Sequence, residues 1–107
     1  MRLEDADGSD LGIIIDGSQG SATDFDIRVV DYAIGFGYPI DIQDWHMAKD
    51  EWQHKEYLMD WDFTDLTQSI YEECGIAVGW MNEKLPEPFF FTIEESALYL
   101  TEKNRYE

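Results

Sequence analysis

Residues 65–101 read DLTQSIYEECGIAVGWMNEKLPEPFFFTIEESALYLT, and this stretch decides the fold. Its first twenty residues place apolar side chains three or four positions apart, which is typical of one buried face of an α-helix. Those apolar positions are Leu66, Ile70, Cys74, Ala77, Trp80 and Met81. We therefore expect a helix over about residues 65–84, with Thr64 or Asp62 as its N-terminal cap.

The end of the stretch predicts a β-hairpin. Pro86 and Pro88 end the helix, because proline lacks the backbone N–H that a helix interior needs. Residues 89–93 and 97–101 are rich in aromatic and β-branched side chains, and Glu94-Glu95-Ser96 between them supplies a turn. Within the helix, Gly75 and Gly79 each cost about 1 kcal/mol relative to alanine. We expect these glycines to mark close packing against another element.

Two further helices precede this stretch. Residues 41–55 carry Ile42, Trp45, Ala48 and Trp52 at helical spacing. Thr23 and Asp26 form a capping-box pattern ahead of a segment that Gly37 would end, and its β-branched content leaves a strand as the alternative. Residues 57–63 alternate between large apolar side chains and acids, which favours a short strand or an extended segment.

The N-terminal residues 1–16 predict a second hairpin. Asp7-Gly8 is a strong turn dipeptide, and three consecutive isoleucines follow it at residues 13–15. The order hairpin, helices, hairpin predicts an α+β fold in which helices pack on a small antiparallel sheet formed by the N- and C-terminal hairpins. The length of 107 residues fits one domain, residues 1–107.

The charge is strongly acidic, with 24 Asp and Glu against 7 Lys and Arg and a net charge of -17. A folded chain of this size exposes roughly 6,000 Å², or about one net charge per 350 Å². Duplex DNA carries about one per 100 Å². The protein can therefore resemble a nucleic acid only if its carboxylates gather on one face. The aromatic content of 15% distinguishes it from a disordered acidic tail.

The same charge bears on partners and location. It argues against direct binding to nucleic-acid phosphates or to anionic membranes, because few cations are available. No apolar run approaches the roughly 20 residues that span a bilayer, and the first residues do not resemble a signal peptide. Cys74 is the only cysteine, so no internal disulfide can form. We expect a cytoplasmic protein that is a monomer or a homodimer.

Several small patterns suggest chemistry, and each has a simpler explanation. The loop after residues 13–15 lies where a phosphate loop would, but Asp16 would repel a phosphate. The acids from Asp5 to Asp16 resemble a calcium loop without its required glycine. His46, Asp50 and His54 could share one helix face as metal ligands, or form a solvated polar face. We expect no catalytic site, metal or cofactor. Trp45, Trp52, Trp61 and Trp80 are mostly core candidates, and one exposed among acids would anchor a basic partner.

The C-terminal part of the chain resembles the corresponding part of small uncharacterised proteins of phages and prophages. The resemblance lies in residues 77–83, AVGWMNE, in Pro86-Glu87, and in the aromatic hairpin over residues 91–100. Met81 stands where leucine is usual in those proteins. The resemblance covers about 25 residues and implies an origin in a mobile element. It implies no catalytic residues.

These observations favour a non-enzymatic, acidic, phage-type inhibitor that binds the nucleic-acid groove of a host defence enzyme, such as a restriction or CRISPR effector. Its carboxylates would stand in for phosphates. The expected partner-binding face is the acid-rich middle of the chain: Asp41, Asp44, Asp50, Glu51, Glu56, Asp60, Asp62, Asp65, Glu72 and Glu73. Two alternatives are an immunity protein or antitoxin that binds a basic nuclease toxin, and a salt-adapted domain in which the charge has no binding role.

Overall fold

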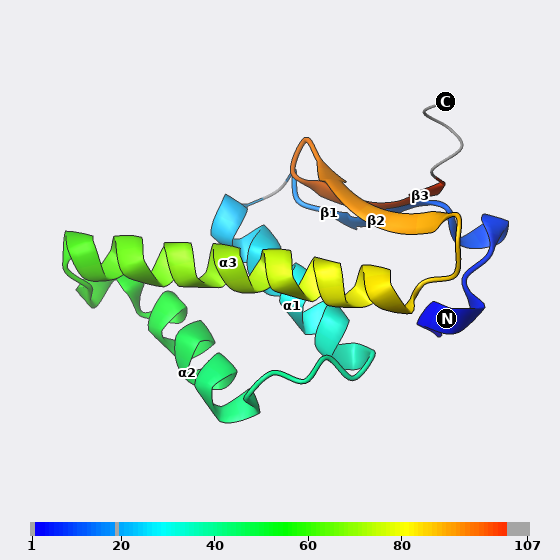
Figure 1. The fold of residues 1–107 in the computed structure, drawn as a ribbon. Coiled ribbons are helices and arrows are strands. Elements are labelled where there is room, and N and C mark those ends of the chain that lie inside the picture. The colour runs from blue at the N-terminus through cyan, green and yellow to red at the C-terminus, as the bar shows by residue number, and fades with distance from the viewer. Residues whose placement is uncertain (1, 19, 103–107) are drawn as a thin grey trace.

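In the computed structural model, which describes residues 2–18 and 20–102, three helices pack with one three-stranded antiparallel sheet (Figure 1). The α+β class is therefore confirmed. The helices are α1 (Ala22–Gly35), α2 (Ile42–Gln53) and α3 (Asp60–Lys84). The strands are β1 (Gly12–Asp16), β2 (Phe89–Glu94) and β3 (Ala97–Glu102), and their order across the sheet is β1-β3-β2.

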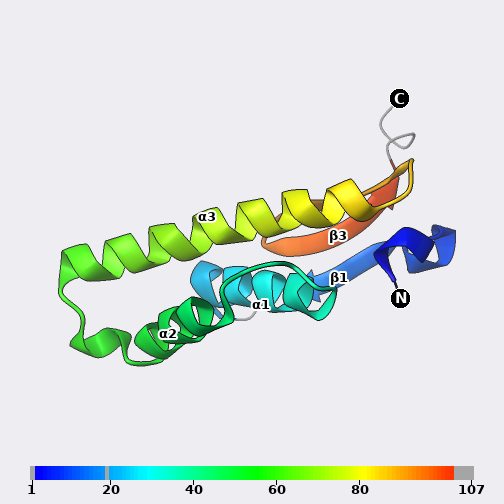
Figure 2. The ribbon, with the colours of Figure 1, turned by 60° about the horizontal axis from the view of Figure 1, so that its bottom comes forward.

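The core lies where α1 and α3 cover one face of the sheet (Figures 1 and 2). The largest of the fully buried side chains that fill it are Val29, Val30, Ile70, Cys74, Met81, Phe91, Leu98 and Leu100. The stripe predicted for α3 is thus confirmed, except that Trp80 is half-buried at its edge. In both views α3 projects beyond the sheet, and α2 lies beside that projecting half.

The C-terminal hairpin forms as predicted. Glu95 and Ser96 have positive φ angles of 52° and 60°, as the two central residues of a tight hairpin turn require. Asn82 of α3 attaches this hairpin to the helix. Its side-chain amide donates to the Phe91 carbonyl at 3.1 Å, and its oxygen accepts from the Phe91 N–H at 2.6 Å. One side chain thereby satisfies both backbone groups of a residue in the edge strand β2.

The prediction of an N-terminal hairpin is wrong for the described residues 2–16. Leu3–Asp5 and Gly8–Asp10 form short 3-10 turns, and β1 pairs with β3 instead of a preceding strand. The physical reason is local: the Asp7 carboxylate accepts a hydrogen bond from the Ser9 N–H at 2.8 Å and caps the second turn. Side-chain bonds of this kind compete with strand pairing.

The prediction of an extended segment over residues 57–63 is also wrong. Lys55–Tyr57 is a 3-10 turn, and α3 begins at Asp60. Asp60 and Asp62 occupy its first turn, where negative charge is favourable next to the helix N-terminus. In α1 the helical alternative is confirmed, with Ser21 rather than Thr23 as its cap and Asp24 completing the capping box.

Gly75 and Gly79 do not mark close packing. A Cβ atom built on either residue meets nothing within 4 Å, so the space beside this face of α3 is open in the described structure. Replacing both glycines with alanine is therefore expected to raise the free energy of unfolding by about 1–2 kcal/mol, because alanine loses less backbone entropy on folding. Urea denaturation measures the change.

A third glycine provides the control for this prediction. At Gly17 a new Cβ would clash with the Ser96 carbonyl oxygen and the Phe25 ring, so Gly17→Ala is expected to destabilise the protein. If the Gly75 and Gly79 substitutions were also destabilising, these positions would be in contact with something in solution.

Candidate partner-binding surface

Helix α2 is held against α1 by two matched hydrogen bonds. The indole N–H of Trp45 donates to Asp31 at 2.8 Å, and the indole N–H of Trp52 donates to Asp24 at 2.7 Å. Each pair of partners is seven residues apart on its own helix, so the two antiparallel helices meet at two successive positions two turns apart. Both tryptophans are buried, and the predicted role of Trp45 and Trp52 in packing is confirmed.

The lysines of this region lie on the same side of α2. Lys49 forms an ion pair with Asp31, with 3.1 Å between Nζ and Oδ1. The Lys55 ammonium lies 4.5 Å from the centre of the Trp52 ring. The hydrogen bond from Trp52, opposed by partial burial, lowers the pKa of Asp24, and Lys55 adds to the effect. The cations of α2 and of the turn after it are thus engaged on the side that faces α1.

The opposite side of α2 forms a groove with α3, which we call the α2–α3 groove. Its larger part has a volume of about 590 Å³, and a smaller part of about 190 Å³ continues it, sharing Asp44, Ala48 and Ser69. Six carboxylates line the two parts: Asp41, Asp44, Glu51, Asp62, Asp65 and Glu73. None of the residues that line this groove is a Lys, Arg or His. The groove therefore concentrates charge of one sign.

Part of the groove lining is apolar, and we call this part its floor. It consists of Met47 and Ala48 of α2, Leu58 of the connection, and Leu66 of α3. Leu66 is buried, Ala48 and Leu58 are half-buried, and Met47 is exposed. A ligand here would meet this hydrocarbon together with the six carboxylates, which we call the rim of the groove.

Six of the ten carboxylates expected on the binding face thus come together in this groove. The other four do not line it. Glu56 lies in the connection between α2 and α3, Asp60 is the first residue of α3, and Asp50 lies near His54 at the end of α2. Glu72 is exposed on α3 and accepts a hydrogen bond from Gln68. Glu73, inside the groove, accepts one from the Tyr38 hydroxyl, whose pKa is raised by burial and by this carboxylate.

Three large apolar side chains lie beside these acids, and we call them the tip cluster. Sequence reasoning missed the exposure of two of them, Tyr57 and Met59. Tyr57, Met59 and Trp61 are 81%, 65% and 66% exposed where α2 leads into α3. Trp61 lies one helical turn from Asp65, so the two side chains are surface neighbours. The sequence allowed for one exposed tryptophan among acids. The alternating pattern of residues 57–63 concealed that its neighbours would be exposed too.

The smaller chemical patterns are explained by local structure. Asp7 and Asp16 accept hydrogen bonds from the backbone and side chains of Ser9 and Ser18, and these bonds lower the pKa of both carboxyls. The Gly17 N–H donates to the Ser96 carbonyl at 2.8 Å and is not available to a phosphate. Gln19 of that loop lies outside the described residues. Across residues 2–18 and 20–102, no three His, Cys, Asp or Glu side chains converge as metal ligands, the set containing His46 included.

One carboxylate is buried away from the groove. Asp26 of α1 is only 8% exposed and accepts a hydrogen bond from the Cys74 thiol of α3. Burial raises the pKa of Asp26, an effect that the bond from Cys74 partly offsets. Burial and the Asp26 charge together raise the pKa of Cys74 to about 12, which keeps the thiol protonated and unreactive.

The raised pKa of Asp26 predicts a specific pH dependence. The group stabilises the fold most below its unfolded pKa, and that contribution is lost as pH rises through the folded pKa. Asp26→Asn is therefore expected to be more stable than the parent at pH 7 by on the order of 1 kcal/mol. The difference should vanish near pH 3.5. Urea denaturation at both pH values measures it, and Glu94→Gln, at an exposed position, controls for net charge. Equal gains from both variants would contradict the prediction.

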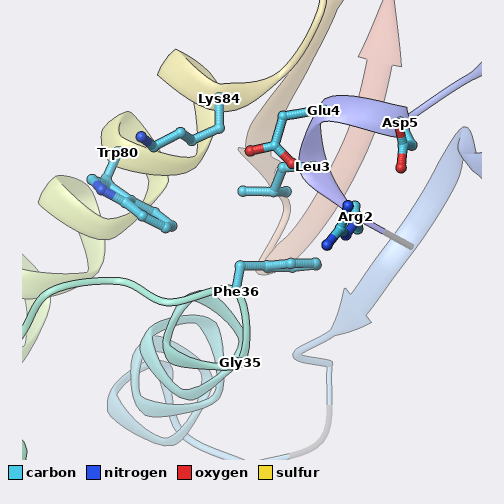
Figure 3. Close-up of a pocket in the computed structure, with 8 residues that line it drawn as sticks. All are labelled: Arg2, Leu3, Glu4, Asp5, Gly35, Phe36, Trp80 and Lys84. Carbon is cyan, nitrogen blue, oxygen red and sulfur yellow. The ribbon is translucent and has the colours of Figure 1, made fainter.

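A second depression lies near the C-terminal end of α3, beside Trp80 and Lys84 (Figure 3). It has a volume of about 670 Å³, and its charged lining residues are Arg2, Glu4, Asp5 and Lys84. The Lys84 ammonium lies 5.4 Å from the centre of the Trp80 ring and is partly engaged there. The charges of these four side chains cancel, so this depression lacks the single sign that distinguishes the α2–α3 groove.

Comparisons with known proteins find no matching family model, no matching curated protein and no matching solved structure. Among the described residues, none of the helices has the length and apolar character needed to cross a membrane.

Proposed function

We propose that this protein works by binding rather than by catalysis, and that it inhibits a nucleic-acid-acting enzyme by offering the α2–α3 groove to its basic surface. The observation that carries the proposal is the charge of the groove: six carboxylates and no cation line it. The target would be a host defence enzyme such as a restriction or CRISPR effector. The site of action would be the cytoplasm of that host.

Electrostatics supports this proposal. Asp62 and Asp65 lie three residues apart on one helix, where like charges repel and destabilise the helix by a few tenths of a kcal/mol. Lys49 and Lys55, which could have compensated them, are engaged on the opposite side of α2. A partner that supplies positive charge would relieve the repulsion. It would also be attracted from a distance, so association would be fast and would weaken with salt.

Displacement of DNA tests the proposal. Fluorescence anisotropy follows a labelled duplex bound to a type I restriction enzyme or to a Cas nuclease–guide complex while the acidic protein is added. We expect release of the duplex from a susceptible enzyme, with an inhibition constant that rises at least tenfold between 50 and 200 mM salt. If neither enzyme loses DNA to a hundredfold excess of protein, inhibition by mimicry of nucleic acid is wrong for these targets.

Matched variants locate the surface. Asp62→Asn with Asp65→Asn removes two groove charges and is expected to weaken inhibition about tenfold. Glu94→Gln with Glu95→Gln removes two charges at the β2–β3 turn, and we expect it to leave inhibition within a factor of two. If the two pairs had equal effects, net charge alone and not the groove would be responsible.

The tip cluster favours a second candidate function, that of an immunity protein or antitoxin. Tyr57, Met59 and Trp61 offer apolar contact area that imitation of a phosphate backbone does not need. Such area is typical of the centre of a tight protein–protein interface. Co-expression with a toxic nuclease encoded beside this gene distinguishes the two: rescue of growth without displacement of DNA from defence enzymes would favour the antitoxin.

A further inference from the structure

We propose that the partner enters the α2–α3 groove as a basic amphipathic α-helix, with its apolar side chains on the groove floor and its Lys and Arg side chains against the rim. This inference rests on the proposed function, since it names the part of the partner that the same surface receives. The floor of the groove, its two helical walls and its negative charge each favour this one kind of occupant.

The floor explains why a purely cationic ligand is not enough. Met47 is 62% exposed and borders the groove together with Ala48, Leu58 and Leu66. Covering this hydrocarbon would contribute favourably to binding in proportion to the apolar area removed from water. Methionine adapts its shape to different apolar partners, which suits a surface that receives another chain. A ligand with only charged groups would leave these apolar side chains exposed to water and would bind without this contribution.

The walls explain why the occupant is a helix. Both walls, α2 and α3, are helices, so their backbone N–H and C=O groups are bonded within each helix except at its ends. An extended peptide in the groove would find few backbone partners, and its own polar groups would lose water without replacement. A helix satisfies its backbone internally and can present apolar residues at i, i+3, i+4 and i+7 to the floor.

The charge explains why the helix is basic and why it is not a second copy of this chain. The larger part of the groove carries Asp44 and Glu51 on one wall and Asp62 and Asp65 on the other. Cationic residues on both flanks of an entering helix would therefore meet a carboxylate on either side. Another copy of this protein, with its own net charge of -17, would be repelled.

The experiment uses the full chain and two designed peptides as probes. Both are capped 18-residue peptides of identical composition: four leucines, eight lysines and arginines, and six alanines. In the first, the leucines lie at positions 4, 8, 11 and 15, on one helical face. In the second, they are spread around the helix. Isothermal titration calorimetry at 150 mM salt gives Kd, and circular dichroism gives the helix content of the bound peptide.

The amphipathic peptide is expected to bind at least tenfold more tightly than its isomer and to become helical in the complex. Met47→Asp is expected to remove this preference. Ile76→Asp is the matched control, because Ile76 is a similarly exposed apolar residue, at 61%, on α3 outside the groove. It should preserve the preference. Equal affinities for the two peptides, no binding of either, or equal effects of the two substitutions would overturn the inference.

The proposed function and this inference can fail separately. If DNA is displaced from a defence enzyme but the two peptides bind alike, the partner is recognised through charge alone, and the function stands without the helix. If the amphipathic peptide binds selectively but no DNA is displaced, the groove receives a basic helix, and the proposed inhibition is wrong.

Discussion

Replacing Trp45 with alanine is expected to lower the free energy of unfolding by about 3–5 kcal/mol, the range for loss of a large buried aromatic side chain. Trp45 is only 4% exposed, and its indole N–H is bonded to Asp31. The substitution leaves a cavity between α1 and α2 and removes the partner of a carboxylate. Because these contacts hold one wall of the α2–α3 groove, binding of a basic ligand should weaken as well.

Trp61 provides a control of identical chemistry. It is 66% exposed, so Trp61→Ala is expected to change stability by no more than about 0.5 kcal/mol. Chemical denaturation of the two variants, followed by circular dichroism at 222 nm, measures the contrast. Equal midpoints for the two variants would mean that α2 does not rest on α1 through its tryptophans.

The second large effect is expected at Asn82. Asn82→Ala should destabilise the protein by about 2–3 kcal/mol, because it leaves both the N–H and the carbonyl of Phe91 without their partner at a part-buried site. The loss also exposes the outer side of β2, an edge strand that ends the sheet in the described structure. Exposed edges pair with other chains, so the variant should also aggregate more readily on heating.

Gln68 is the matched control for Asn82. It lies on the same helix with the same amide group, but its side chain is exposed and bonds only to Glu72. Gln68→Ala is expected to change stability by less than about 0.5 kcal/mol. Urea denaturation and light scattering during heating measure the two effects at Asn82. If the Gln68 variant were destabilised as much as the Asn82 variant, the loss of stability would reflect the change in helix composition and not the contact with β2.

The elements that sequence reasoning predicted correctly are those that local signals determine. The stripe from Leu66 to Met81 specifies the face of α3 without knowledge of its neighbours. The N-terminal hairpin was wrong because the Asp7 side chain bonds to the backbone two residues on, a local alternative that the turn dipeptide does not reveal. The prediction of an extended segment over residues 57–63 was wrong for another reason. Alternation of apolar and polar residues indicates a strand only when the apolar side is buried, and here Tyr57, Met59 and Trp61 are all exposed.

The candidate surface was only partly predictable for a different reason. The density of acids along residues 41–65 is visible in the sequence, but the α2–α3 groove depends on how closely α2 approaches α3 across the short connection over residues 54–59. That approach depends on Trp45 and Trp52 reaching Asp31 and Asp24, which no spacing rule identifies in advance. The sequence also does not reveal whether the lysines near these acids line the groove, because only the tertiary structure places Lys49 on the side of α2 that faces α1.

The position of β3 at the centre of the sheet has a consequence for biosynthesis. Both β1 and β2 pair with β3, and about 80 residues separate Asp16 from Ala97. A ribosome adds about 5–20 residues per second, so about 4–16 s pass between synthesis of the three isoleucines of β1 and synthesis of β3. During that interval the nascent chain carries an unpaired, aggregation-prone segment. Mutual repulsion between highly anionic nascent chains on one polysome would keep such segments apart until translation reaches β3.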